Sequence, residues 1–243
     1  MLLLMAGTAE ARIIASGLAA AKIPAIASLA GVTRDPKDLP ITVRRGGFGG
    51  AAAFEDFLDQ NAIRAIIDAT HPFAIQITQR TAEIAQRRGL PYLQVLRPAW
   101  HAEPGDNWTQ IEREQDAVNH IADGATVFLA TGRQTLPGFA NLSGRALICR
   151  QINTPDGPFP FPNGRFLVGR PPFSVADELA LFTKLGVDCL IVKNAGGTAN
   201  RTKLTAAAQL GIPVLMIRRP TQPDAPRVET AAGALEWAQA LKW

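Results

Sequence analysis

The sequence has 243 residues, 47% of them hydrophobic, so the chain can bury a substantial core in one large domain or in two smaller ones. Its net charge of +4 is modest and it has no run of five basic residues, which argues against a nucleic-acid-binding protein. The opening apolar run is six residues long, too short to span a membrane. We therefore expect a cytoplasmic monomer that binds neither nucleic acid nor membrane.

The residues that most often hold metals or form disulfides are not arranged for either purpose. Cys149 and Cys189 each lie in an apolar, strand-like run without C-x-x-C spacing, so buried thiols are favoured over a disulfide or a metal site. The three histidines, His71, His101 and His120, have no cysteine or carboxylate partner at ligand spacing. We expect no metal centre.

The first stretch of the chain has the pattern of a nucleotide-binding turn. Residues 2–6 form an apolar run, Gly7 interrupts it, and apolar residues then recur at helical spacing, which predicts a strand, a tight turn and a helix. The main-chain N–H groups and helix dipole of such a turn form an anion site suited to a dinucleotide pyrophosphate. Only Gly7 of the pattern G-x-G-x-x-G is present, so an ordinary strand-to-helix turn is an equally good interpretation.

A second strand is predicted at residues 24–29. An NAD site would place an acidic residue near its end, about 20 residues after the glycine turn. Ser28, Thr33 and Arg34 occupy that region instead, and hydroxyl and guanidinium groups suit the 2′-phosphate of NADP. The prediction is a preference for NADP over NAD, with a solvated loop as the alternative.

Two further loops follow predicted strands. After a short strand at 41–43, four glycines surround Phe48 at residues 46–50, a composition that lets a backbone approach a ligand or that forms a plain flexible loop. The strand at 63–68 ends before Thr70, His71 and Pro72, where ligands of parallel sheets bind. Alternatively, Thr70 caps the next helix, predicted at 74–87, and Pro72 lies in its first turn. His71 is the histidine best placed for chemistry.

The second half of the chain repeats the first. A strand at 89–98 closes the first half, a polar linker is predicted at 99–110 and a helix at 113–122. Three strand-like segments then recur in order at offsets of 122 to 125 residues. This predicts an α/β protein of two similar Rossmann-like lobes with parallel sheets, residues 1–98 and 99–243, and an interdomain cleft. The last helix, at 231–242, could cover either lobe.

Seven blocks spread over nearly the whole chain resemble the precorrin-6A reductase (cobalt-precorrin-6A reductase) family of cobalamin biosynthesis. The blocks are AGTAEA at 6–11, SLAG at 28–31, GGFGG at 46–50, DATHPFA at 68–74, RPAW at 97–100, TGRQ at 131–134 and KNAGG at 193–197. Ala6 replaces a glycine and Ala195 a serine of many members. The resemblance implies NADPH-dependent hydride transfer to one double bond of the macrocycle precorrin-6A, or of its cobalt form, which gives a dihydro product.

The resemblance also implies roles for individual residues. The first lobe would bind NADPH and the second the tetrapyrrole, whose carboxylates account for the excess of arginine. The expected cofactor-binding residues are Gly7, Thr8, Ala9, Glu10, Ser28, Thr33, Arg34, Gly47, Phe48, Gly49, Thr70, His71 and Pro72. The expected substrate-binding residues are Arg97, Thr131, Gly132, Arg133, Gln134, Lys193, Asn194, Gly196 and Gly197. His71 is the candidate proton donor, or it only hydrogen-bonds the cofactor amide.

Two other functions remain open on the sequence. A two-lobed nucleotide or anion sensor without turnover would bind NADPH without oxidising it. An NADP reductase of another small substrate would be favoured by a Tyr-x-x-x-Lys pair, but the single tyrosine, Tyr92, is followed by Leu96 at that spacing.

Overall fold

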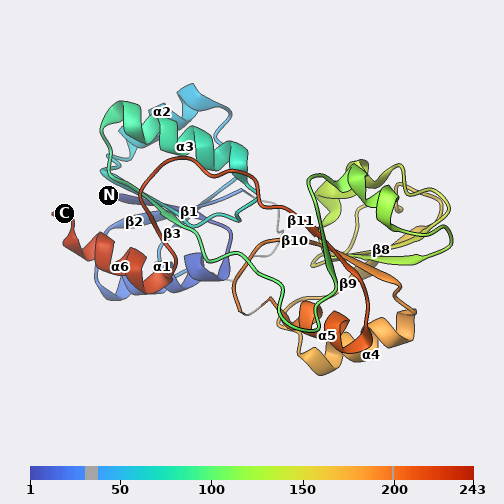
Figure 1. Cartoon of the computed structure of the whole chain (residues 1–243). Helices are drawn as coiled ribbons and strands as arrows, with labels where there is room; N and C mark the ends of the chain where they lie inside the picture. The colour runs from blue at the N-terminus through green and yellow to red at the C-terminus, as the bar shows by residue number, and fades with distance from the viewer. Residues whose placement is uncertain (31–37, 199) are drawn as a thin grey trace. The chain divides into compact units, whose positions relative to one another are not determined.

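The computed structural model describes residues 1–30, 38–198 and 200–243. The chain forms two compact units (Figure 1). Unit 1 contains Met1–Pro98 and Pro220–Trp243, and unit 2 contains Ala99–Arg219. The predicted boundary after residue 98 is therefore a boundary in the structure, but the predicted second domain of 99–243 ends at Arg219, because the last part of the chain returns to unit 1.

Unit 1 is built on a six-stranded sheet in which every strand pair is parallel. The strand order is β12-β5-β4-β1-β2-β3, which is the 3-2-1-4-5-6 order of a Rossmann fold read from the other edge. The strands are β1 (Leu2–Ala6), β2 (Ala25–Leu29), β3 (Thr42–Arg45), β4 (Ala65–Asp68), β5 (Tyr92–Val95) and β12 (Arg227–Val228). The central strands β1 and β4 are buried along their whole length, as expected for a sheet covered on both faces.

Helices cover both faces of this sheet (Figure 1). Helices α1 (Ala9–Ala20) and α6 (Ala231–Ala240) pack on one face, and α2 (Ala51–Gln60) and α3 (Ile75–Arg88) pack on the other. A Cβ at Gly17 of α1 would lie 2.4 Å from Cδ1 of Leu235 in α6, so the glycine permits close packing of these two helices. The C-terminal helix, whose position the sequence left open, thus packs on unit 1.

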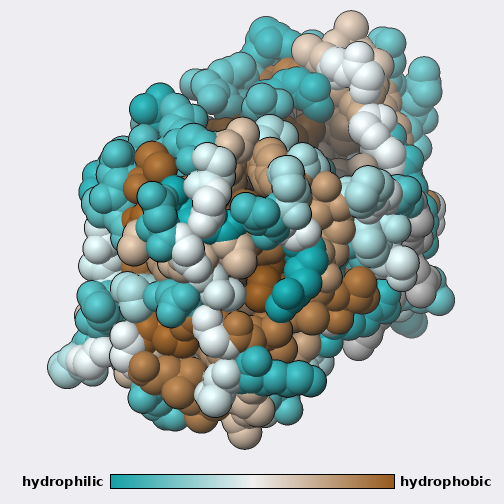
Figure 2. All heavy atoms as spheres, turned by 90° about the vertical axis from the view of Figure 1, so that its right-hand side faces the viewer, coloured by the Kyte–Doolittle hydropathy of each residue, from teal (hydrophilic) through white to brown (hydrophobic). Residues whose placement is uncertain are grey.

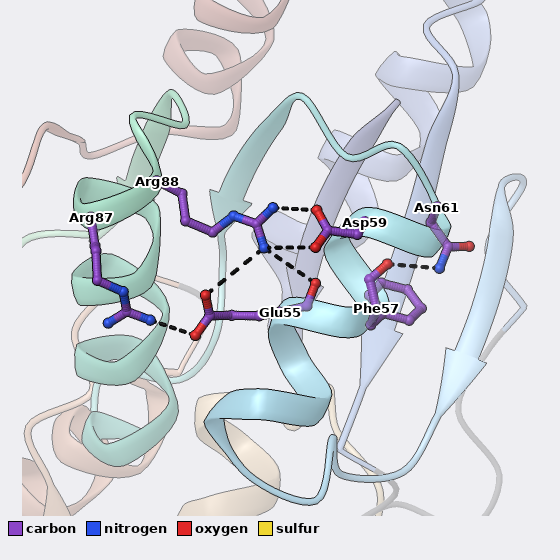
Figure 3. Close-up of polar contacts among 6 residues, drawn as sticks. All are labelled: Glu55, Phe57, Asp59, Asn61, Arg87 and Arg88. Carbon is purple, nitrogen blue, oxygen red and sulfur yellow. Dashed lines mark hydrogen bonds and ion pairs between the residues drawn. The ribbon is translucent and has the colours of Figure 1, made fainter.

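Charged side chains join α2 to α3 on the surface (Figure 3). The guanidinium of Arg88 in α3 binds the carboxylates of Asp59 and Glu55 in α2, and Arg87 forms a second ion pair with Glu55. At the end of α2, the Asn61 side-chain amide donates to the main-chain oxygen of Phe57 across 2.9 Å. These contacts join α2 to α3, and α2 supports the glycine-rich loop at residues 46–50.

Unit 2 repeats the architecture of unit 1. Its six parallel strands lie in the order β6-β11-β10-β7-β8-β9. They are β6 (Trp108–Ile111), β7 (Thr126–Leu129), β8 (Ala146–Gln151), β9 (Gly164–Val168), β10 (Cys189–Lys193) and β11 (Val214–Ile217). Helices α4 (Val175–Leu185) and α5 (Thr202–Leu210) pack against the sheet, and the short 3-10 helices η1 (Glu114–His120) and η2 (Arg133–Phe139) contact each other. Strands β7, β10 and β11 take the places of β1, β4 and β5, which confirms the predicted repeat.

In each sheet the sixth strand follows a crossing of the chain from one unit to the other. Strand β6 follows the first five strands of unit 1 but pairs with β11 in unit 2, and β12 follows β11 but pairs with β5 in unit 1. The prediction of an irregular linker at 99–110 was wrong at its end, because β6 begins at Trp108. The helix predicted at 113–122 is the 3-10 helix η1. The chain therefore crosses twice between the units.

Both cysteines are free and buried, and burial raises the pKa of Cys149 to about 11 and that of Cys189 to about 12, so both are protonated at neutral pH. No helix among the described residues is both long and apolar enough to cross a membrane. On the side viewed in Figure 2, hydrophobic residues form separate patches interrupted by hydrophilic side chains.

Candidate functional site

The predicted cofactor residues of unit 1 that the structure describes lie at or beyond the carboxyl end of the sheet. Because the strands are parallel, the segments that follow β1, β2, β3 and β4 all leave the sheet at this edge. The loops after β1 and β4 are in direct proximity, since a Cβ at Gly7 would lie 3.9 Å from both His71 N and Thr70 Cα. In Rossmann sheets ligands bind where the strand order reverses, which here is between β1 and β4.

The turn after β1 exposes the N-terminus of α1. Thr8 is the N-cap of this helix: its hydroxyl accepts from Ala11 N at 3.2 Å and donates to Ala69 O at 2.8 Å, which ties the turn to the loop after β4. The first N–H groups of an α-helix have no partner within the helix and favour an anion. The turn at Gly7 and the first turn at Ala9 and Glu10 therefore suit a phosphate group.

Glu10 places a negative charge in this first helical turn, and Arg97 balances it. The Arg97 side chain is 10% exposed, and its guanidinium lies 2.9 Å from the Glu10 carboxylate. Arg97 follows β5, so it reaches the same edge of the sheet as the glycine turn. The structure thus places Arg97, a predicted substrate residue, beside a predicted cofactor residue in unit 1.

The ends of β2 and β3 are joined by an arginine that the sequence did not single out. Arg44 Nη1 donates to Ser28 Oγ and to Gly46 O, each at 2.8 Å, and Nη2 donates to Gly47 O at 3.1 Å. Ser28 is 4% exposed, so its hydroxyl is largely covered. The other two residues predicted for the adenosine phosphate, Thr33 and Arg34, lie outside the described residues.

The glycine-rich loop after β3 has a defined conformation. Gly46, Gly49 and Gly50 have φ angles of 99°, 82° and 129°, which disfavour side chains, whereas Gly47 has no such requirement and open space around it. The Phe48 ring packs edge-on against Phe54, with the ring centroids 4.6 Å apart. A second edge-on contact joins Phe48 to the other phenylalanine of α2. The loop therefore rests on α2.

A buried carboxylate at the end of β4 anchors the loop that follows this strand. Asp68, which is 2% exposed, accepts from Thr70 N at 3.0 Å and from the Tyr92 hydroxyl at 3.1 Å. Burial, and then the charge of Asp68, raise the pKa of Tyr92 far above its usual range, so the phenol stays protonated. The main-chain N of Phe73 donates to Nδ1 of His71 at 3.3 Å, which places the hydrogen of a neutral imidazole on Nε2.

The alternative helix-capping roles predicted for this loop were wrong. Helix α3 begins at Ile75 with Ala74 as its N-cap, so Thr70 does not cap it and Pro72 lies before its first turn. The Thr70 hydroxyl instead lies 3.1 Å from that of Thr78. The Pro72 carbonyl accepts from the side-chain amide of Gln222 at 3.0 Å, so the returning C-terminal segment braces the loop.

In unit 2, the predicted substrate residues follow β7 and β10 at the carboxyl end of the second sheet. Lys193 ends β10, and burial lowers its pKa despite the opposing effect of Glu114. The Asn194 side chain accepts from Trp100 N at 2.8 Å and donates to Trp100 O at 2.9 Å. Gly197 O accepts from the indole of Trp100 at 2.7 Å, so this loop and the segment at residue 100 hold each other.

The residues after β7 are more exposed to solvent than those after β10. Arg133 and Gln134 are exposed at the start of η2, and Gly132 precedes them with a φ of 82°. Arg133 forms an exposed ion pair with Asp156 at 3.1 Å. The Thr131 hydroxyl lies 2.7 Å from that of Thr135 within η2. This loop offers hydrogen-bond donors to an anion at the surface of unit 2.

Sequence reasoning missed Arg44, Asp68, Tyr92 and Gln222 as parts of the site. An acidic residue at the end of a fully apolar strand was a usable signal for Asp68, because a buried carboxylate needs nearby donors. No three histidine, cysteine or acidic side chains gather as a metal site in the part of the chain that the structure describes.

Comparisons with known proteins give one consistent result. The model of the family "Precorrin-6x reductase CbiJ/CobK" matches residues 1–239. The chain is 44% identical to a precorrin-6A reductase of Rhodococcus erythropolis, over 99% of this chain and 98% of that protein. It is 27% identical to a cobalt-precorrin-6A reductase of Priestia megaterium, over 90% and 91%. The solved structure "CobK precorrin-6A reductase" superimposes with a TM-score of 0.93 at 36% identity and covers 98% of this chain and 95% of that one.

Proposed function

This chain belongs to the precorrin-6x reductase family and is an oxidoreductase, and from that premise we propose that it reduces one carbon–carbon double bond of precorrin-6A, or of its cobalt form, with NADPH. The observation that carries this proposal is the proximity of the glycine turn after β1 to the loop of Thr70 and His71 after β4, where a Cβ at Gly7 would lie 3.9 Å from His71 N. It brings an anion-binding helix N-terminus next to a titratable side chain at the switch point of a Rossmann sheet.

Unit 1 is the proposed cofactor domain. Gly7, Ala9 and Glu10 would hold the pyrophosphate and the adjoining ribose, and Thr8 fixes the turn that presents them. The nicotinamide side would lie against the loop after β4, which contains Thr70, His71 and Pro72, and the cofactor would also contact Gly47, Phe48 and Gly49 in the loop after β3. When bound, the nicotinamide supplies a hydride, and the protein's task is to orient it and to exclude water.

Positive and hydrogen-bonding groups are proposed to bind the carboxylates of the macrocycle. The unit 2 residues are Thr131, Gly132, Arg133, Gln134, Lys193, Asn194, Gly196 and Gly197. Lys193 is the strongest of them, because a bound carboxylate would compensate the burial that lowers its pKa. Asn194 acts indirectly in this proposal, since both polar atoms of its side chain hold Trp100. Arg97 would balance Glu10 and add positive charge near the carboxylates of the substrate.

Reduction of the double bond adds a hydride to one carbon and a proton to its neighbour. His71 is the proposed proton donor, because it is the titratable side chain on the loop nearest the glycine turn. The same imidazole could serve by donating a hydrogen bond from Nε2 to the cofactor amide.

The function is tested by incubating the protein with precorrin-6A and NADPH under anaerobic conditions. We expect the absorption spectrum of the pigment to shift while one NADPH is oxidised per macrocycle, and we expect NADH to support a slower reaction. Binding of NADPH without loss of its absorbance in the presence of the macrocycle would contradict the proposal and favour a sensor. Parallel assays with the cobalt form decide which of the two macrocycles is the substrate.

A further inference from the structure

Arg44 lies where a Rossmann domain distinguishes NADP from NAD. In the parallel pair of β2 and β3, Arg44 is in register with Ser28, one residue before each strand ends. The ribose of the adenosine binds beyond the end of the second strand, where an acid selects the 2′-hydroxyl of NAD and an arginine accommodates the 2′-phosphate of NADP. Arg44 thus lies at the carboxyl end of the sheet, where this selection takes place.

The guanidinium of Arg44 is held in one orientation. It donates three hydrogen bonds, to Ser28 Oγ and to the carbonyls of Gly46 and Gly47. One face of the group lies 3.9 Å from the centroid of the Phe48 ring. A guanidinium ordered by both hydrogen bonds and a ring loses little further freedom when it binds a phosphate.

The charge of Arg44 has no carboxylate partner within 4.0 Å among the residues whose positions are described. Its hydrogen bonds go to neutral oxygens, and partial burial lowers its pKa without removing its charge. A dianionic phosphate at this position would supply a counter-charge. Ser28, at 4% exposure, is better placed to orient Arg44 than to contact the phosphate itself.

We infer that Arg44 binds the 2′-phosphate of NADPH and is the residue that sets the preference for NADPH over NADH. This inference rests on the proposed function, because it assumes that a nicotinamide dinucleotide binds in unit 1. It makes Ser28 a positioning residue for Arg44. It also couples the recognition of the 2′-phosphate to the glycine-rich loop, whose carbonyls at Gly46 and Gly47 bind the same guanidinium.

The test compares the full-length wild-type chain with Arg44→Ala, Arg44→Lys and Arg45→Ala. Arg45 is the matched control, because it is the next residue of β3, is exposed, and points to the opposite face of the strand. Each protein is titrated with adenosine 2′,5′-bisphosphate, 5′-AMP, NADPH and NADH by calorimetry. In Arg44→Ala, loss of a charge-assisted contact should lower the affinity for adenosine 2′,5′-bisphosphate and for NADPH, the two ligands with a 2′-phosphate, by about 10- to 100-fold.

The other ligands and variants are the controls. We expect 5′-AMP and NADH to bind Arg44→Ala within about twofold of wild type, which also shows that the variant is folded, and we expect Arg45→Ala to bind all four ligands normally. Arg44→Lys should keep part of the preference for ligands with a 2′-phosphate, since lysine keeps the charge but not the planar fork. Equal weakening of NADPH and NADH by Arg44→Ala would overturn the inference and leave Arg44 as an organiser of the loop.

A wild-type preference for NADPH that survives Arg44→Ala overturns the role of Arg44 alone. A wild-type protein that binds NADPH and NADH equally contradicts the NADPH assignment of the proposed function as well. The two failures are therefore distinguished by the wild-type titration.

Discussion

The hydroxyl of Tyr92 donates a hydrogen bond to Oδ2 of Asp68 across 3.1 Å, from the start of β5 to the end of β4. The other oxygen of the same buried carboxylate accepts from Thr70 N at 3.0 Å. Asp68 thus links the interior of unit 1 to the loop that carries His71. Because a buried carboxylate is costly without donors, both bonds stabilise Asp68 and the position of this loop.

Tyr92→Phe should lower the free energy of unfolding by about 1.5–3 kcal/mol, the usual contribution of a hydrogen bond to a charged group. It should also reduce kcat, because the loop that carries His71 loses one of its anchors. Urea denaturation measures the first effect and steady-state kinetics the second. In a double-mutant cycle with Asp68→Asn, additive losses would show that the two side chains do not act together.

The central strands were predictable from the sequence because they are buried on both faces. Strands β1, β4 and β11 are apolar at nearly every position. This pattern, repeated at a nearly constant offset, was enough to predict the two Rossmann-like lobes. The edge strands were not predictable. In β6 the two middle residues are exposed, and β12 is only two residues long, so neither has a continuous apolar run.

The candidate site was predicted where it depends on local features and missed where it depends on pairing between strands. The glycine turn at Gly7 and the loop at His71 follow directly from glycine positions and strand ends. The contacts of Arg44 with Ser28 and of Asp68 with Tyr92 join residues 16 and 24 positions apart. They exist because sheet register brings those positions together, which the pattern of a single strand does not encode.

The glycines of the loop after β3 should separate into two groups. Gly50→Ala should destabilise the protein by about 1–2 kcal/mol, because its φ of 129° strains any residue with a Cβ. Gly47→Ala should leave stability unchanged, since its Cβ would meet no atom within 4 Å. If Gly47 lies against the cofactor, the same substitution should weaken NADPH binding. Thermal unfolding and NADPH titration of both variants check this, and normal NADPH binding by Gly47→Ala would remove Gly47 from the cofactor residues.

Substitutions of His71 should distinguish a proton donor from a hydrogen-bond donor. The Nδ1 atom of His71 accepts from Phe73 N, so Nε2 carries the hydrogen of the neutral ring. A glutamine amide can replace an Nε2–H hydrogen bond but cannot donate a proton. If His71 is the proton donor, His71→Gln and His71→Ala should both lower kcat by about 100- to 10,000-fold and should remove the same limb of the pH–rate profile. A glutamine variant with near-normal kcat and an unchanged pH profile would assign His71 to cofactor positioning.

Lys203 should make the stability of unit 2 depend on pH in the alkaline range. Its ammonium donates to Asn200 O at 2.5 Å and lies 5.6 Å from the ring of Trp100. Burial, and then the charge of Arg150, lower its pKa from 10.5 to about 8, against the opposing effect of Glu178. Between these two pKa values the unfolded chain binds more protons than the folded one, so the contribution of Lys203 to the free energy of unfolding rises with pH and is constant below about 8.

Lys203→Met removes this titration and provides the measurement. At pH 7 the variant should be more stable than wild type, by up to about 3 kcal/mol, because it no longer buries a charge. The difference should shrink as the pH rises from about 8 to 10.5, the range set by the folded and unfolded pKa values. Both proteins contain Cys149 and Cys189, so the titration of these thiols cancels in the difference between two urea denaturation series. Parallel stability curves over this range would show that Lys203 keeps a normal pKa and that its burial costs the fold nothing.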